Sequence, residues 1–294
     1  MRLYGVIPPM VTPFKENGDV DMEGLEKLVH FLRERVDGLF VCGSYGSGPL
    51  MNIDERKMVA ARAIELAAGK VPVIVHTGSA SSREAAQLSA HAASMGAAAV
   101  SAVAPYYFHH NGDGVLAYYR AILDAVPTGF PAYVYHNPRF SGYEIDMKTM
   151  EQLADIGIAG VKDATFDIAK FSAYKSAFAA QGFDVVLGTE SMWLSARALG
   201  AEAFIPGLAN AFPELCTKMH REGMHDDYAN CRESQFLVNK VRELMYLAGS
   251  TQQAVYAMLS IRGIVRCAPR SPFLAASEAA THALERSLAD LGVL

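Results

Sequence analysis

Eight short apolar runs recur along the sequence, and amphipathic, helix-like stretches lie between them. The runs are Gly5–Met10, Gly38–Cys42, Pro72–Thr77, Ala99–Ala104, Ala132–Tyr135, Ile158–Lys162, Val185–Gly188 and Ala203–Pro206. Continuous apolar strands that alternate with helices are typical of a parallel sheet covered on both faces. Eight such units, roughly 30 residues apart, predict an α/β fold of the closed (β/α)8 type, the TIM barrel.

An open, doubly wound sheet is the main alternative, and it usually carries a glycine-rich phosphate loop after its first strand. Here the first run leads into Val11–Phe14, which contains no glycine. From about Met224 onward the strand-like runs stop and helical patterns dominate. We therefore expect a barrel with the active site over residues 1–223 and an appended C-terminal helical region over residues 224–294, packed on the barrel.

Charge and cysteine content restrict the classes of partner. The 26 basic and 31 acidic residues give a formal net charge of -5, and no basic run interrupts the sequence, so no nucleic-acid partner is expected. No segment is long and apolar enough to span a bilayer, and Pro8 and Pro9 stop the first apolar run, which is not a signal peptide. The four cysteines form no CxxC pair, which is typical of free thiols in a reducing compartment. We expect a cytoplasmic protein with no membrane partner.

Histidines at three positions, His76, His109 and His110, raise the question of a metal site. Adjacent histidines cannot easily chelate one ion, and no acidic residue stands at ligand spacing to them. We expect no metal and no organic cofactor.

Lys162 is the strongest catalytic candidate because it ends the run Ile158–Lys162, and barrel enzymes place their chemistry at the carboxyl ends of the strands. Removing an ammonium group from water costs several kcal/mol unless it is paired, and the usual response is a lowered pKa. A lysine with a lowered pKa carries a free amine that can attack a carbonyl. The structural alternative is an ion pair with Asp163 or Glu190 at the barrel rim.

Two further features point to the same end of the barrel. Tyr135 ends the strand before Lys162, and a phenol beside an imine can pass a proton to or from the substrate oxygen. Alone, such a tyrosine is explained by a hydrogen bond at the rim, but its pairing with Lys162 favours catalysis. The glycine-rich loop Gly43–Gly48 follows the second strand, and its backbone amides could hold a carboxylate. It lacks the Gly-Lys-Ser/Thr ending of a nucleotide-binding loop.

Together these motifs resemble the dihydrodipicolinate synthase / N-acetylneuraminate lyase family of class I pyruvate-dependent aldolases. The matching segments are Gly5–Phe14, Gly43–Gly46, Pro105–Tyr107, Tyr135–Pro138, Gly160–Thr165 and Gly188–Glu190. The match keeps the order and spacing from about residue 3 to residue 210, and a helical tail of the expected size follows.

The resemblance implies a role for each matching residue. Lys162 would form an imine with pyruvate or a larger 2-oxo acid, and Tyr135 would shuttle the proton. Ser44 would relay that proton, and Tyr107 would reach in from a neighbouring subunit of a homotetramer built from two tight dimers. The backbone amides of Ser44 and Tyr45 would hold the substrate carboxylate. The substrate-binding positions would be Tyr45, Gly188, Glu190 and Ile205.

Three departures from the family pattern concern the substrate. Tyr45 stands where relatives carry a second serine or threonine, and Ser47 replaces a glutamate. Phe140 replaces the arginine that dihydrodipicolinate synthases place five residues after the catalytic tyrosine, with Arg139 one place away. The last departure argues against the synthesis of lysine precursors from aspartate semialdehyde, unless a shift of the loop lets Arg139 take over.

We therefore expect a Schiff-base lyase or aldolase that reversibly cleaves a 2-oxo acid, with sugar acids as one class of substrate, to pyruvate and an aldehyde. A Schiff-base dehydratase of a 2-keto-3-deoxy sugar acid is an alternative, since the same imine acidifies C3. Dihydrodipicolinate synthase is a second. A non-catalytic 2-oxo-acid-binding barrel is a third, motivated by Tyr45 and Ser47. The presence of Lys162, Tyr135 and Tyr107 argues against this third alternative.

Overall fold

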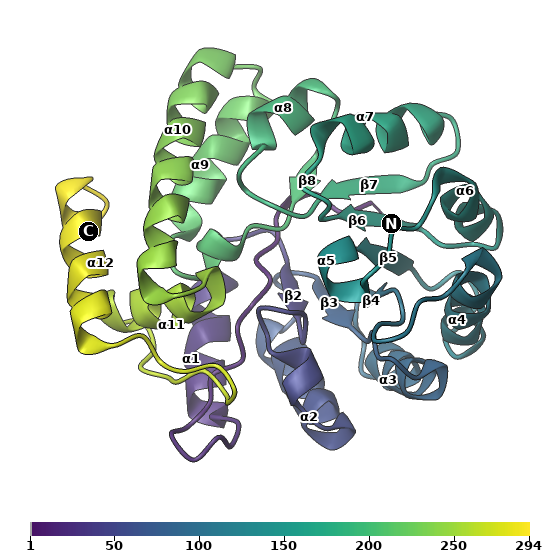
Figure 1. The fold of residues 1–294 in the computed structure, drawn as a ribbon, viewed down its shortest axis with the longest axis horizontal. Helices are drawn as coiled ribbons and strands as arrows, with labels where there is room; N and C mark the ends of the chain where they lie inside the picture. Colours follow the sequence, from purple (N-terminus) through teal and green to yellow (C-terminus); the bar gives the residue numbers. More distant parts are fainter. Residues whose placement is uncertain (1) are drawn as a thin grey trace.

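Eight parallel strands form one closed sheet in the computed structural model, which describes residues 2–294 (Figure 1). The strands are β1 Gly5–Val6, β2 Leu39–Val41, β3 Val73–His76, β4 Ala99–Val103, β5 Ala132–His136, β6 Gly160–Asp163, β7 Asp184–Leu187 and β8 Ala203–Phe204. They pair in the order β1-β8-β7-β6-β5-β4-β3-β2. Between the outer two strands, the Phe40 amide donates to Pro8 O at 3.0 Å and the Met10 amide donates to Phe40 O at 2.9 Å. The predicted barrel is confirmed.

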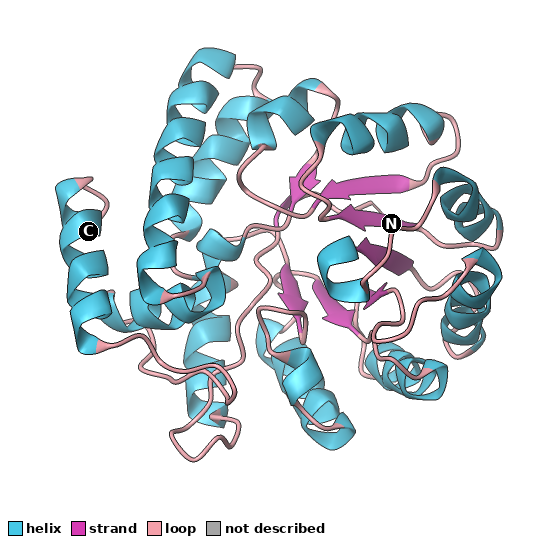
Figure 2. Cartoon of the chain, viewed as in Figure 1, coloured by secondary structure: helices cyan, strands magenta, loops and turns pink. Residues whose placement is uncertain are grey.

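Helices surround the strands on the outside of the barrel (Figure 2). Those that follow the strands are α1 Met22–Leu32, α2 Ile53–Ala67, α3 Ser82–Ser94, α4 Gly112–Asp124, α5 Pro138–Ser141, α6 Met147–Asp155, α7 Ile168–Ala177, α8 Trp193–Ala198 and α9 Pro213–Met224. Short 3-10 turns lie at η1 Gly48–Leu50 and η2 Gly207–Asn210. Each strand is thus buried on both faces, which explains the continuous apolar runs in the sequence.

The last part of the chain is helical and lies along one side of the barrel (Figure 1). It consists of α10 Tyr228–Leu244, η3 Met245–Ala248, α11 Thr251–Ile261 and α12 Glu278–Asp290. α10 packs against α8 and α9, and α11 packs against η2, which follows β8. The division of the chain at residue 224 stays a prediction, but these helices approach the carboxyl ends of the strands.

Alternate residues of each strand face the barrel interior, because successive side chains point to opposite sides. Tyr133 packs with Phe40 and Ile205 in the interior, whereas Val134, its neighbour on β5, belongs to the layer under the helices. Tyr135 points inward again, one layer closer to the carboxyl ends of the strands. Gly160 makes room for this packing, since a Cβ there would lie 2.7 Å from the Tyr133 ring.

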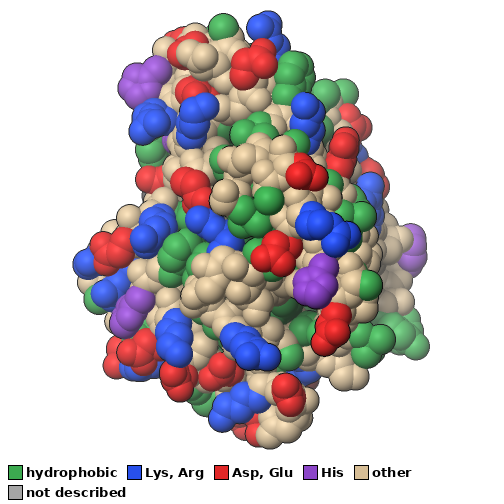
Figure 3. Space-filling view, turned by 90° about the vertical axis from the view of Figure 1, so that its left-hand side faces the viewer, with side chains coloured by type: hydrophobic (Ala, Val, Ile, Leu, Met, Phe, Trp, Pro, Cys, Tyr) green, Lys and Arg blue, Asp and Glu red, His purple; other side chains and the backbone are tan. Residues whose placement is uncertain are grey.

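Over residues 2–294, no helix has the length and apolar character needed to cross a bilayer. Acidic and basic side chains are interspersed on the face shown in Figure 3.

Candidate active site

Lys162 and Tyr135 are direct neighbours in the barrel interior, because they are register partners on β6 and β5. The Lys162 side chain is buried, with 3% of the residue exposed. Its Nζ lies 3.7 Å from the centroid of the Tyr135 ring and 4.1 Å from that of the Phe40 ring. The amine is therefore enclosed by aromatic surfaces.

Burial determines the charge state of Lys162. It lowers the pKa of the amine from 10.5 to about 7. Among the described residues no acidic side chain forms an ion pair with Lys162: Asp163 accepts a hydrogen bond from the Thr165 amide at 3.0 Å, and Glu190 pairs elsewhere. The ion-pair alternative is thus not found, and a large fraction of the amine is neutral and nucleophilic near pH 7.

The Tyr135 hydroxyl belongs to a short chain of hydrogen bonds. Ser44 Oγ lies 3.2 Å from it, and either hydroxyl can be the donor. Asn137 Nδ2 donates to the same hydroxyl at 3.2 Å. Burial raises the pKa of the phenol, which is therefore protonated at neutral pH. Asn137 was missed from the sequence, although its position directly after β5 was the available signal.

The glycine-rich loop Gly43–Gly48 is held in place by α11. Gln252 Nε2 donates to the carbonyl oxygen of Ser44, and the hydroxyls of Tyr45 and Thr251 are hydrogen-bonded. The bulky Tyr45 ring lies over Gly207, where a Cβ would come within 2.3 Å of it. A glycine after β8 thus accommodates the tyrosine that departs from the family pattern.

Ser47, the second departure in this loop, is buried in a left-handed conformation with φ 54°. Its side chain is hydrogen-bonded to Tyr256 of α11. The Tyr256 hydroxyl also donates to Thr12 O at 2.9 Å, and Thr12 Oγ1 donates to Gly46 O at 2.7 Å. Ser47 therefore has a structural role in joining the loop to the helical region.

Glu190 is buried, with 1% exposed, and both of its carboxylate oxygens have partners. Oε1 lies 2.7 Å from Arg242 Nη1, and Oε2 accepts from the Gly207 amide at 3.1 Å. Arg242 comes from α10, and it was missed because no local sequence pattern links that helix to the barrel mouth.

A cavity of about 200 Å3 brings the predicted residues together. It is lined by all of them except Tyr107, namely Ser44, Tyr45, Tyr135, Lys162, Gly188, Glu190 and Ile205. Gly188 allows the ends of β6 and β7 to approach, since a Cβ there would lie 2.6 Å from Asp163 O. An adjoining, largely apolar cavity of about 250 Å3 shares Ser44 and Tyr135 and includes Tyr106.

Tyr107 lies outside this cavity. It is 87% exposed, and its ring meets that of Phe108 edge-on at 4.9 Å. Within one chain, the structure does not bring Tyr107 to Lys162.

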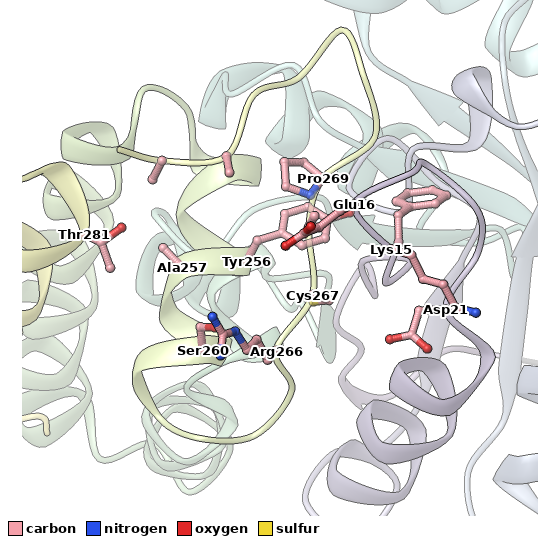
Figure 4. A pocket seen from close by; sticks show the side chains of 14 residues that line it. Lys15, Glu16, Asp21, Tyr256, Ala257, Ser260, Arg266, Cys267, Pro269 and Thr281 are labelled. Atoms are coloured by element: carbon pink, nitrogen blue, oxygen red, sulfur yellow. The ribbon is translucent and has the colours of Figure 1, made fainter. Parts of the chain in front are cut away.

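A larger cavity of about 550 Å3 lies elsewhere, where the loop after β1 faces α11 and the segment that follows it (Figure 4). Lys15, Glu16 and Arg266 contribute exposed charges to it, and none of the predicted site residues lines it. The smaller cavity is therefore the candidate active site.

The histidines do not form a metal centre. Across residues 2–294, no group of three or more His, Cys, Asp or Glu side chains is arranged to hold an ion. His76 is buried at the edge of the Tyr135 ring, with centroids 5.8 Å apart, and its Nε2 accepts from the Val103 amide at 3.1 Å. Burial, followed by the charges of Arg56 and Lys162, holds the pKa of His76 well below its usual value. A neutral ring supports the wall of the site.

Comparison with known proteins shows the family of the chain. The model of the dihydrodipicolinate synthetase family matches residues 2–291. A 4-hydroxy-tetrahydrodipicolinate synthase of Hyphomonas neptunium is 35% identical, over 99% of both chains. Among solved structures, a prophage protein of the dihydrodipicolinic acid synthase family from E. coli K12, in complex with pyruvate, superposes with a TM-score of 0.93 at 25% identity over 99% of both chains. The sialic acid aldolase of Ruminococcus gnavus gives 0.92 at 25% identity over 98% of both.

The match therefore spans nearly the whole chain, including the helical region. A strand-end lysine with a free amine is the group that a Schiff-base mechanism needs. The chain belongs to the dihydrodipicolinate synthetase family and is a Schiff-base-forming, pyruvate-dependent lyase.

Proposed function

We propose that this enzyme reversibly cleaves a short, hydroxylated 2-oxo acid to pyruvate and an aldehyde, with Lys162 as the nucleophile. The observation that carries the proposal is the buried Lys162 amine, which has a pKa of about 7 and is placed against Tyr135. The neutral amine attacks the keto carbon, and the resulting carbinolamine loses water to form a protonated imine. Tyr135, protonated at rest, gives its proton to the departing hydroxyl and becomes a phenolate.

The same tyrosine then acts as the base. The phenolate takes the proton of the C4 hydroxyl, directly or through Ser44, 3.2 Å away. The C3–C4 bond breaks and the aldehyde leaves. The electron pair of the broken C3–C4 bond passes into the imine to give an enamine. Protonation at C3 and hydrolysis release pyruvate and restore the amine. The backbone amides of Ser44 and Tyr45 would hold the substrate carboxylate, and Gly188, Glu190 and Ile205 would shape the cavity around the chain.

The volume of the cavity supports a short substrate. Clefts for drug-sized ligands measure about 300–1,000 Å3, and this one measures about 200 Å3. A substrate of about six carbons therefore suits it better than one as large as a sialic acid.

The assembly proposed for this chain is a homotetramer built from tight dimers. The exposed aromatic ring of Tyr107, outside the cavity of its own chain, is available to a second copy. Tyr107 would complete the proton path of the neighbouring subunit.

Condensation of pyruvate with aspartate semialdehyde is the second candidate. A relative that carries the synthase name is 35% identical, and Arg139 lines the cavity beside Phe140. The sequence argues against this reaction, because Phe140 stands where the synthases carry an arginine. Since Arg139 also lines the cavity, a guanidinium is present there and this objection is weakened.

A product screen separates these functions. The enzyme is incubated with 2-oxo-3-deoxy sugar acids, and pyruvate release and water loss are followed; pyruvate with aspartate semialdehyde is a parallel reaction. We expect release of pyruvate without net dehydration. Dehydration alone would favour the dehydratase, and efficient condensation with the semialdehyde, lost in Arg139→Ala, would favour the synthase. Absence of both turnover and imine formation would favour the non-catalytic 2-oxo-acid-binding barrel.

A further inference from the structure

Asn137 lies between β5 and α5, and its side chain is held by the turn that follows it. Its Oδ1 accepts a hydrogen bond from the Arg139 amide at 3.2 Å, as the N-cap of α5. The carbonyl oxygen of Asn137 accepts from the amides of Phe140 and Ser141, each at 3.0 Å. Because Oδ1 is the partner of a backbone N–H group, the orientation of the side-chain amide is fixed and Nδ2 faces Tyr135.

The contact between Asn137 and the Tyr135 hydroxyl is a hydrogen bond with only one possible direction. Nδ2 lies 3.2 Å from the hydroxyl oxygen and carries N–H groups but no acceptor, so the tyrosine oxygen must accept. The proton of Tyr135 therefore points to Ser44, also 3.2 Å away, or into the cavity. Asn137 and Tyr135 are each 4% exposed, and both line the cavity. Away from bulk water such a hydrogen bond is electrostatically stronger.

A donor in this position favours the ionised form of Tyr135 over the neutral form. The phenolate oxygen carries a negative charge, and a hydrogen bond to a charged group contributes more than one to a neutral group. Burial raises the pKa of the Tyr135 phenol, and the hydrogen bonds with Ser44 and Asn137 oppose this rise. Ser44 can be donor or acceptor in its pair with Tyr135, whereas Asn137 can only donate.

We propose that Asn137 is a positioning residue that stabilises the phenolate of Tyr135 during imine formation. In this step the nitrogen lone pair of the carbinolamine forms the C=N bond while its C–O bond breaks. The hydroxyl leaves as water with the proton of Tyr135, which becomes a phenolate beside the new positive charge. The N–H group of Asn137 is already directed at the oxygen that gains the negative charge, so no rearrangement is needed when the proton leaves. The inference rests on the proposed function, because Tyr135 is the acid of that mechanism.

Two substitutions separate the donor of Asn137 from its role as a helix cap. Asn137→Asp keeps the shape and the capping oxygen but replaces the donor by a second carboxylate oxygen. Asn137→Ser keeps a capping hydroxyl and lacks the amide. The rate of imine formation at saturating pyruvate is measured by stopped flow with the full-length protein, on the alkaline plateau of each pH profile, where the Lys162 amine is neutral.

We expect the rate to fall roughly tenfold in Asn137→Ser, as for the loss of a hydrogen bond to a charged group, and at least as far in Asn137→Asp. A merely structural role predicts the opposite order, because aspartate is the closer replacement for asparagine and should then react at nearly the wild-type rate.

A second measurement tests whether Asn137 acts through Tyr135. In the Tyr135→Phe background no phenolate forms, so Asn137→Ser should change the rate by less than about twofold. Ser141→Ala is the control for the turn, because the Ser141 hydroxyl donates to the carbonyl oxygens of Asn137 and Tyr143 and has no bond to Tyr135. Its rate should equal that of the wild type.

Three results would overturn the inference: a wild-type rate in Asn137→Asp, an equal effect of Asn137→Ser with and without the Tyr135 hydroxyl, or an equal loss in Ser141→Ala. Failure of the wild-type protein to form an imine with pyruvate would instead contradict the proposed function.

Discussion

At the scale of single residues, the proposed chemistry depends on Lys162, whose amine the barrel keeps partly uncharged. Phe40 and Tyr135 enclose the amine without supplying an opposite charge, so desolvation alone lowers its pKa. Such a site stabilises the nucleophile at the expense of the fold, because the unfolded chain binds the proton more tightly.

The rate of imine formation should depend on the protonation state of Lys162. Since the neutral amine is the reactive form, the rate of imine formation with pyruvate should rise as the pH passes through about 7 and then level off. Stopped-flow measurement of the rate between pH 5 and 9 checks this. An inflection near 10, the value of an exposed lysine, would contradict the burial argument.

Replacement of Lys162 by methionine should separate activity from stability. The pKa is about 7 in the folded chain against an ordinary 10.5, so the unfolded chain binds more protons between these values and stability decreases as the pH falls from 10.5 to 7. Lys162→Met removes this cost and should stabilise the protein at pH 7 by on the order of 1–3 kcal/mol while abolishing turnover. Denaturant unfolding at pH 7 and 10 measures the difference, which should shrink at pH 10. A variant less stable than the wild type at pH 7 would refute the prediction.

Tyr135→Phe should remove the proposed proton carrier while it keeps the aromatic wall beside Lys162. Loss of a general acid and base costs roughly 10²–10⁴ in rate, so kcat should fall within that range with little change in the melting temperature. Steady-state kinetics and thermal unfolding provide the two readouts. Retention of more than half of the wild-type kcat would remove Tyr135 from the mechanism.

At the scale of elements, α11 holds the glycine-rich loop Gly43–Gly48 in place. Thr251, Gln252 and Tyr256 reach Tyr45, Ser44 and Ser47 respectively. The C-terminal helices therefore form part of the candidate active site.

Gln252→Ala should loosen the loop without breaking the helix. Loss of the hydrogen bond to Ser44 O should raise KM for pyruvate several-fold and change kcat less, because the backbone amides that would hold the carboxylate lose their fixed position. Gln253→Ala, whose side chain bonds Leu274 O instead, is the control on the same helix. Equal effects in the two variants would point to a general effect on α11.

The sequence predicted the cavity residues at the strand ends well, and it predicted those on the C-terminal helices poorly. The regular spacing of apolar runs places Tyr135 and Lys162 on adjacent strands, and register pairing then makes them neighbours. Arg242 and Gln252 come from amphipathic helices whose polar faces look alike, so nothing local distinguishes a residue that points to the cavity from one in solvent. The fit of Tyr45 over Gly207 depends on two loops 162 residues apart and appears only in three dimensions.

At the scale of the whole molecule, the position of Tyr107 predicts sites shared between subunits. Lys162→Ala and Tyr107→Phe should each be nearly inactive alone. Mixed by co-refolding, they should recover roughly a quarter of the wild-type activity, because half of the symmetric dimers are hybrids and each hybrid has one intact site. No recovery on mixing, or an active monomer in light scattering, would remove the shared-site proposal.

The central claim is that the Lys162 amine forms an imine with pyruvate, and chemical trapping tests it most directly. The protein is incubated with pyruvate and borohydride, digested and analysed by mass spectrometry, with Lys162→Ala and the exposed-lysine variant Lys148→Ala treated in parallel. We expect one reduced pyruvate on the peptide that contains Lys162, in step with loss of activity, in the wild type and in Lys148→Ala but not in Lys162→Ala. An adduct on another lysine, or none at saturating pyruvate, would contradict the account.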